Sequence, residues 1–417
     1  MRKTSTTCSN PRTSDCPRYT VDLDTPPEER WLHVIRDFSH HFPVVIEFVD
    51  DIIGTGMTSG LITSTLTSFN ANGKVFYSKE LEGIAAASGM DIGKIALLQI
   101  AYEFFAACTS VVVDMPCAHM NDGKSPQEGS AGDEAEAAPF HIRTMDWSLD
   151  VLKPMTIEVD FTRGGRVITT ATTWAGYVGV LTGMKPGVAS VSVNYRRTVS
   201  GESWLGEWDF AVGVFVNAWK GLCRAWPVAF LVREVLMTCD DFSSLVGALE
   251  SSSLMAPTYI TVAGALAGEG QVITRDRDSA VHPWLLRDHG PIAQTNMDHF
   301  KISPPAAKST KKSQDTFDWQ DICCSRYRER AARLGIRHMA SQQSLHPEMF
   351  WALFSHPPCL AEDTVYTVAM CPQSGMYVTR KDVTSADKRL GRATWKKIFD
   401  AELSSFSEQE DSGARRF

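Results

Sequence analysis

The stretch FFAACTSVVVD, residues 104–114, decides how the chain is interpreted. Its first half is apolar and continues a helical pattern, and at Cys108 a β-branched run begins, which is typical of a buried strand. A cysteine at the start of such a strand is most simply a core residue, because free cysteine is among the most buried residue types. The segments on either side favour a second interpretation, in which Cys108 takes part in chemistry.

The hydrophobic period changes at Cys108. From Glu28 to about Leu98 it is helical, and after Cys108 apolar residues alternate with small or polar ones. A Gly-Gly pair at a hairpin position supports strand pairing. Strands, then helices, then strands and a last helix predict antiparallel sheets covered by helix layers, an α+β fold. The predicted strands are 108–114, 140–147, 155–183, 188–197, 257–264, 270–276, 283–288 and 290–296, and the predicted helices between them are 204–220, 226–239 and 241–252.

The composition excludes several classes of protein. The chain has 417 residues with 43% hydrophobic content and a net charge of −8, so it can bury a sizeable core and shows no nucleic-acid-binding surface. Its ten cysteines form no CxxC pair, so we expect no zinc cage, no other metal and no cofactor, while disulfides stay open. The first twenty residues contain no apolar h-region, so no signal peptide is predicted. The longest apolar runs are too short to span a bilayer.

The chain divides into three predicted parts: a helical N-terminal segment (1–107), a main domain (108–381) and a charged tail (382–417) that we expect to fray. Two stretches have the composition of solvated insertions. Residues 120–139 are acidic and rich in small residues, and residues 303–315 are basic and rich in proline and serine.

Three short motifs stand out together: CTS at 108–110, IRTMDWS at 142–148 and QTNMD at 294–298. A hairpin between the first two would bring Arg143 and Asp146 beside Cys108. On their own, Arg143 and Asp146 could form an ordinary salt bridge, and Asn296 could be a turn residue at a strand end. The three motifs become more informative when they are read with the surrounding sequence.

The sequence resembles the acid ceramidase and N-acylethanolamine acid amidase family of N-terminal-nucleophile hydrolases, slightly closer to the ceramidase side. The resemblance runs from YTVDLDTPPEERW (19–31) to VYTVAMCPQSGMYVTR (365–380), and it skips the two insertions. The motifs that carry it occur in the family's order: YEFFAACTS, RTMDW, LKPMTIEVDF, AGYVGVLTGMKPG, APTYI, EGQVITRDR and QTNMD.

The resemblance implies an αββα sandwich, in which two antiparallel sheets lie between helix layers. It also implies self-cleavage between Ala107 and Cys108, which would leave an α/β heterodimer made from one chain. Cleavage would make Cys108 an N-terminal residue whose own α-amine can accept the thiol proton. That expectation explains a cysteine at the first position of a strand.

The same resemblance assigns further residues. Arg143 would favour the thiolate and hold the carbonyl side of the substrate. Asp146 would hold the new ammonium group, and Asn296 would donate its amide N–H to an oxyanion hole. A further family arginine precedes an alanine by three residues, and Arg328 of YRERAARL matches it best.

One position departs from the family pattern. The family has an Asn-Glu pair where this chain has Asn194 and Tyr195, so the asparagine is retained and the acid is replaced. By its place in the family pattern, the pair Asn194 and Tyr195 is expected to support the substrate or the oxyanion. The missing acid leaves the mechanism of self-cleavage open. Cys117 is an alternative nucleophile by residue type. It lies at the start of a polar insertion and does not begin a predicted strand, so Cys108 is preferred.

The implied substrate is a fatty acyl amide, most simply N-acylsphingosine (ceramide). An N-acylethanolamine is the alternative within the same enzyme class, and a lipid-binding relative that does not mature is the alternative outside it. Contact with a membrane surface or a lipid carrier would suit such a substrate, and the aromatic segment 204–226 is either a wall of the lipid site or ordinary helix core. Family members are lysosomal, which sets the expected compartment.

Overall fold

A computed structural model gives the structure of the chain. It describes residues 14–53, 57–73, 75–100, 107–116, 137–196, 217, 220, 225–301, 325–342 and 345–414. Most of the two predicted insertions, the predicted helix 204–220 and Cys117 lie outside these residues.

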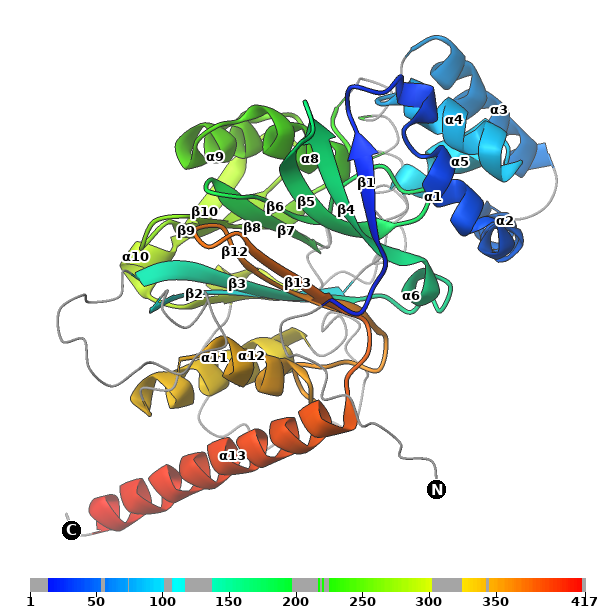
Figure 1. Cartoon of the computed structure of the whole chain (residues 1–417). Helices are drawn as coiled ribbons and strands as arrows, with labels where there is room; N and C mark the ends of the chain where they lie inside the picture. The colour runs from blue at the N-terminus through cyan, green and yellow to red at the C-terminus, as the bar shows by residue number, and fades with distance from the viewer. Residues whose placement is uncertain are drawn as a thin grey trace, which may run out of the picture.

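Two sheets are stacked face to face, as Figure 1 shows. The eight-stranded sheet has the order β1-β4-β5-β6-β7-β8-β9-β10, and the five-stranded sheet has the order β11-β2-β3-β12-β13. The strands of the first sheet are β1 (Arg18–Asp22), β4 (Thr156–Arg163), β5 (Arg166–Trp174), β6 (Thr182–Lys185), β7 (Ala189–Tyr195), β8 (Thr258–Gly264), β9 (Gly270–Arg275) and β10 (Ala280–Leu285). Those of the second are β2 (Ala107–Pro116), β3 (Ala137–Asp146), β11 (Ile292–Gln294), β12 (Thr364–Cys371) and β13 (Met376–Arg380).

Helices cover the outer face of each sheet (Figure 1). Helices α8 (Val228–Thr238) and α9 (Phe242–Ser251) lie on the eight-stranded sheet, and α11 (Ser325–Ser341) and α12 (Pro347–Phe354) lie on the five-stranded one. The predicted αββα sandwich is therefore confirmed. The Gly-Gly pair does form the β4–β5 hairpin, where Gly164 and Gly165 both have positive φ, as a type I′ turn requires.

The N-terminal segment is helical, as its period predicts. It contains α1 (Leu32–Asp37), α2 (Phe42–Ile53), α3 (Met57–Ala71), α4 (Ser78–Ser88) and α5 (Ile92–Ile100), with short 3₁₀ turns at Pro27–Glu29 and Ser39–His41. These helices gather beside one end of the eight-stranded sheet (Figure 1). Two further short helices, α6 (Leu152–Met155) and α10 (Leu286–His289), connect strands of the main domain, and a 3₁₀ turn (His299–Lys301) lies between β11 and α11.

Strand β2 separates two environments because successive side chains point to opposite faces of a sheet. Val111 and Val113 belong to the core under α11 and α12. Cys108 and Ser110 point the other way, toward the eight-stranded sheet, where Ser110 meets Ser192 of β7. The alternation therefore places the Cys108 side chain between the two sheets.

Two expectations for the ends of the chain are wrong. Residues 18–22 form β1, which pairs with β4 in parallel, so the larger sheet is not wholly antiparallel. The segment expected to fray contains α13 (Ser385–Ala414). Trp395 and Ile398 of this helix are 2% and 1% exposed and pack into the core with α12, which is why a segment of charged composition is ordered there.

A buried ion pair joins the N-terminal helices to the main domain. Both carboxylate oxygens of Glu80, on α4, accept hydrogen bonds of 2.7 Å from the Arg233 guanidinium on α8. Arg30 and the Trp31 indole donate to the same carboxylate at 2.9 and 2.7 Å. Burial raises the pKa of the Glu80 carboxyl, but these partners outweigh burial and hold it below its usual value. The contact stays ionised in mildly acidic solution.

Candidate active site

The Cys108 side chain is fully buried at the beginning of β2. Its sulfur accepts a hydrogen bond of 3.2 Å from Nη2 of Arg143 and lies 3.7 Å from the sulfur of Met145. Both neighbours come from β3, because β2 and β3 form the predicted antiparallel pair, with Cys108 opposite Met145 and Ser110 opposite Arg143. The hairpin thus brings a cation to the thiol, as the sequence predicts.

The Arg143 guanidinium is held in place by groups from two other strands. Nη2 also donates to the Val193 carbonyl on β7 at 2.7 Å, and Nη1 donates to the Tyr366 hydroxyl on β12 at 3.0 Å. The Tyr366 ring lies 5.5 Å from the guanidinium carbon. Because Arg143 is fully buried, this arrangement fixes a permanent positive charge beside the sulfur.

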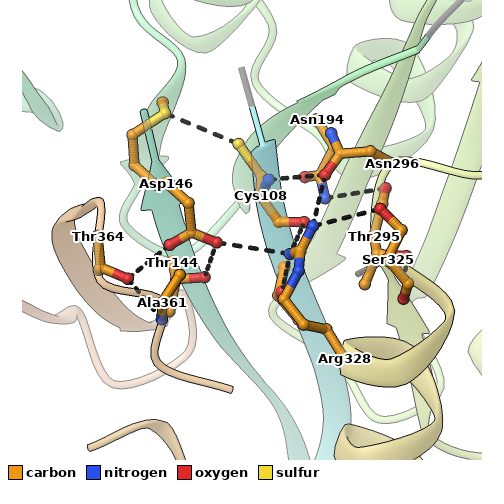
Figure 2. Close-up of polar contacts among 12 residues, drawn as sticks. Cys108, Thr144, Asp146, Asn194, Thr295, Asn296, Ser325, Arg328, Ala361 and Thr364 are labelled. Atoms are coloured by element: carbon orange, nitrogen blue, oxygen red, sulfur yellow. Dashed lines mark hydrogen bonds and ion pairs between the residues drawn. The ribbon is translucent and has the colours of Figure 1, made fainter. Parts of the chain in front are cut away.

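The backbone of Cys108 is held on both sides (Figure 2). Its N–H donates to Oδ1 of Asn296 at 2.8 Å, and its carbonyl accepts from Nη1 of Arg328 at 2.8 Å. Nη2 of Arg328 donates to the same Asn296 oxygen at 3.0 Å. Asn296 follows β11 and Arg328 lies on α11, so residues far apart in sequence meet around one peptide unit.

Asp146 lies at the end of β3, opposite Ala107 rather than Cys108. Its carboxylate accepts hydrogen bonds from Thr364 at 2.7 Å and Thr144 at 3.3 Å, and it forms a 3.4 Å ion pair with Arg328. Burial raises the pKa of the Asp146 carboxyl, and the Arg328 charge and the Thr364 hydrogen bond oppose that effect. In this intact chain the Cys108 nitrogen is contacted by Asn296, the residue predicted for the oxyanion.

Charged side chains lie close to the sulfur in a buried region. Arg143 and Arg328 place two guanidinium groups there, and Asp146 forms an ion pair with Arg328. The Arg143 guanidinium, 3.2 Å from the sulfur, can stabilise an anion that forms at or beside Cys108.

Asn194 and Tyr195, at the end of β7, lie next to the Asn296 loop. Nδ2 of Asn194 donates to the carbonyls of Gln294 and Thr295 at 3.0 and 3.3 Å. The Tyr195 carbonyl accepts from Nδ2 of Asn296 at 2.9 Å. Asn194 thus contacts the backbone that precedes Asn296, and Tyr195 contacts Asn296 through its main chain, which is independent of the side chain at that position.

The sequence alone did not point to Tyr366 and Thr364, which hold Arg143 and Asp146. Both lie on β12, which pairs with β3, but only knowledge of that pairing brings them to the site. Among the described residues, no two cysteines form a disulfide and no three metal-ligating side chains gather into a site. None of the described helices is both long and apolar enough to cross a membrane.

Comparison with known proteins identifies the family to which the chain belongs. The acid ceramidase of Macaca fascicularis is 31% identical over 293 residues, which cover 68% of this chain and 70% of that protein. The chain belongs to the acid ceramidase family. The human acid ceramidase is 29% identical over 371 residues, 87% of this chain and 85% of the relative, so the family relationship extends over most of the chain.

Two further matches come from the amidase branch of the same family. A family model described as the beta subunit of N-acylethanolamine-hydrolyzing acid amidase matches residues 14–68, within the N-terminal segment. A solved structure, the Caenorhabditis elegans ortholog of N-acylethanolamine-hydrolyzing acid amidase, aligns with a TM-score of 0.47 and 27% identity over 64% of this chain and 93% of that one. Acid ceramidases hydrolyse amide bonds, so the chain belongs to a family of amide hydrolases.

Proposed function

We propose that this protein hydrolyses the amide bond of a fatty acyl amide, with Cys108 as the nucleophile after self-cleavage between Ala107 and Cys108. The observation that carries the proposal is the fully buried sulfur at 3.2 Å from a guanidinium, at the start of a strand whose first peptide unit is held by Asn296 and Arg328. A structural cysteine has no need of this set of contacts.

Self-cleavage would begin with attack of the Cys108 sulfur on the Ala107 carbonyl carbon. The carbon–sulfur bond forms, the peptide carbon–nitrogen bond breaks, and the nitrogen takes the thiol proton, which leaves a thioester. Water then hydrolyses the thioester to the Ala107 carboxylate and the free thiol. The Asn296 oxygen, 2.8 Å from the Cys108 nitrogen, is positioned to keep that nitrogen in place as a free amine, and Asp146 would add its charge to the same region.

Substrate hydrolysis would follow the same course with a different carbonyl. The amine accepts the thiol proton, the sulfur attacks the amide carbon, and the proton passes to the leaving amine as the carbon–nitrogen bond breaks. Water releases the fatty acid from the thioester. Arg143 would stabilise the sulfur anion and Arg328 would order the Cys108 peptide, while the Asn296 amide would stabilise the oxyanion.

A small apolar pocket near the site, about 50 Å³ in volume, would take part of a fatty acyl chain. It lies between helices α2 and α5 and the segment that follows Asp146, and its lining includes Phe48, Leu98, Trp147 and Trp174. The Trp174 ring also contacts the ring of Tyr366, which binds Arg143. The similarity to acid ceramidases supports N-acylsphingosine as the substrate, and the match to the amidase family model supports an N-acylethanolamine as the alternative.

One experiment tests both steps. The purified protein is incubated at acidic pH, its fragments are separated under denaturing conditions, and the smaller ones are sequenced from their N-termini. We expect two fragments, one beginning at Cys108, together with release of fatty acid from N-acylsphingosine at a higher kcat/KM than from an N-acylethanolamine. The reverse preference would assign the amidase activity. An uncut chain that binds either lipid without releasing fatty acid would indicate the non-maturing lipid-binding protein.

The proposed cleavage sets the boundaries of the two polypeptides in the matured protein. Residues 1–107 would form the smaller piece and residues 108–381, with the tail 382–417, the larger one. The pieces would stay together as a heterodimer through β1 and the Glu80–Arg233 pair. We also propose a lysosomal location, as for the family, and the low pKa of Glu80 fits an acidic compartment. Contact with a membrane surface or a lipid carrier stays a prediction.

Replacement of Asn296 by alanine should lower kcat by roughly 10²–10³, the usual cost of losing an oxyanion donor. The variant loses the amide that would stabilise the oxyanion and also the acceptor for the Cys108 nitrogen. The fold should be retained, because the alanine leaves the backbone of the loop intact, although the lost contacts to the Cys108 N–H and the Tyr195 carbonyl should lower stability by about 1–3 kcal/mol. The measurement is kcat on the matured protein, together with the thermal midpoint of unfolding.

Asn296→Asp is the matched control. Aspartate keeps an oxygen that can accept from the Cys108 nitrogen but has no N–H to donate. If the oxyanion contribution dominates, Asn296→Asp should be as slow as Asn296→Ala. An Asp variant with turnover close to the starting protein would show that holding the nitrogen is the main role of Asn296.

A further inference from the structure

A row of buried polar side chains crosses the space between the two sheets and ends beside the candidate site. The Nε2 atom of His141 on β3 lies 2.8 Å from the Ser192 hydroxyl on β7, which lies 2.8 Å from the Ser110 hydroxyl on β2. Ser110 donates at 2.8 Å to Oδ1 of Asn194, and Nδ2 of Asn194 holds the backbone just before Asn296. All four side chains of the row are fully buried.

The direction of each hydrogen bond in the row can be derived from its last member. The Asn194 oxygen can only accept, so the Ser110 proton points to it, and the Ser110 oxygen must then accept from Ser192. The Ser192 oxygen is left to accept from Nε2–H of His141. Every donor in the row therefore points toward Asn194.

This direction places a proton on Nε2 of His141. Nδ1 lies 3.0 Å from the Ser190 hydroxyl, which also lies 3.4 Å from the Ala263 carbonyl. Burial, together with the positive charge of Arg143 two residues away on the same face of β3, lowers the pKa of His141 to about 3. His141 therefore stays neutral in mildly acidic solution, and the row keeps one orientation.

We propose that His141, Ser192 and Ser110 are positioning residues, which act through the Asn194 amide to fix the loop that presents Asn296 to Cys108. The proposal rests on the proposed function. Ser110 lies two residues after Cys108 on the same face of β2, so the row ties the strand of the nucleophile to the loop of Asn296. None of the three touches the reacting atoms.

The test is Ser110→Ala, which removes one hydroxyl and leaves the strand unchanged. The Asn194 amide loses its donor and its hold on the Asn296 loop weakens, so kcat should fall roughly tenfold while KM changes little. Ser355→Ala is the matched control, because this buried hydroxyl at the end of α12 is not part of the row and donates to the Trp351 carbonyl of that helix. The control should keep its kcat, and both variants should lose similar thermal stability.

A double-variant cycle separates positioning from a general loss of stability. If Ser110 acts through Asn296, Ser110→Ala should cost little further kcat once Asn296 is already alanine. A cost that simply adds to that of Asn296→Ala would overturn the proposal, as would a Ser110→Ala enzyme with full kcat. Wild-type protein that neither cuts itself nor releases fatty acid would instead overturn the proposed function.

His141→Gln provides a second variant in case Ser110→Ala folds poorly. The glutamine amide can replace the Nε2–H donor, so this enzyme should keep most of its kcat and an unchanged pH profile. His141→Leu removes the donor and should show the kcat loss of Ser110→Ala. A shifted pH profile in His141→Gln would show that His141 moves protons during the reaction and would overturn the positioning role.

Discussion

The Cys108→Ala protein should remain one uncut chain and release no fatty acid above background. The sulfur would be the atom that breaks the peptide bond at Ala107 and the atom that attacks the substrate, so its loss removes both steps. Loss of a nucleophile in well-studied hydrolases lowers kcat by about 10⁶. The measurements are the mass of the chain after acidic incubation and fatty acid release from N-acylsphingosine.

Two variants distinguish chemistry from packing at this position. Cys371→Ala removes an equally buried cysteine on β12 of the same sheet, and it should mature and turn over normally. Cys108→Ser keeps the shape but has a weaker nucleophile, so cleavage should be slow and any matured fraction should hydrolyse amides poorly. If Cys108→Ala still splits into two fragments and still releases fatty acid, the nucleophile lies elsewhere.

Replacement of Arg233 by methionine should lower the free energy of unfolding by about 3–5 kcal/mol, because it leaves the Glu80 carboxylate buried without its main partner. The side chains of Arg233 and Glu80 are 0% and 1% exposed, so solvent does not screen their interaction. Thermal or denaturant unfolding of the intact chain measures the effect. Lys79→Met, which breaks the exposed Lys79–Glu82 pair, should change stability by less than about 1 kcal/mol.

The contribution of the Glu80–Arg233 ion pair to the free energy of unfolding should also depend on pH. The pKa of Glu80 is lower in the folded protein than in the unfolded chain, so the stabilisation is fully present above the unfolded value of about 4.3. It is lost as the pH falls through the lower folded value. The difference in stability between the starting protein and a Glu80→Gln, Arg233→Met double variant should therefore shrink only below about pH 4.3. A difference that shrinks already near neutral pH would contradict the assignment.

The local sequence pattern was sufficient to predict that Cys108 and Arg143 lie side by side. Alternation along 108–114 and 140–147 predicted the hairpin that brings Arg143 to Cys108, because side-chain direction in a strand depends only on spacing. Asn296 and Arg328 lie 188 and 220 residues from Cys108, and no local period can bring such residues together. Their place in the site was expected only from the family resemblance.

The wrong predictions for the two ends of the chain, and the two site residues that the sequence did not indicate, also have physical causes. The strand β1 is only five residues long and follows a polar, proline-containing stretch, so its short alternation was outweighed by composition. The sequence of helix α13 is rich in charged residues, and the apolar contact of its described side chains depends on a few residues such as Trp395 and Ile398. Tyr366 and Thr364 depend on which strand lies beside β3, which only the tertiary structure determines.

The parallel pairing of β1 with β4 has a consequence for how a matured enzyme could be regained after denaturation. In the uncut chain, β1 is tethered to its partner strand, and refolding does not depend on protein concentration. If the proposed cleavage occurs, the same edge strand would belong to a separate polypeptide, and its return would become a second-order association. The matured protein would then persist through a high barrier to unfolding rather than through reversible folding, and a single excursion to the unfolded state at low concentration would inactivate it for good.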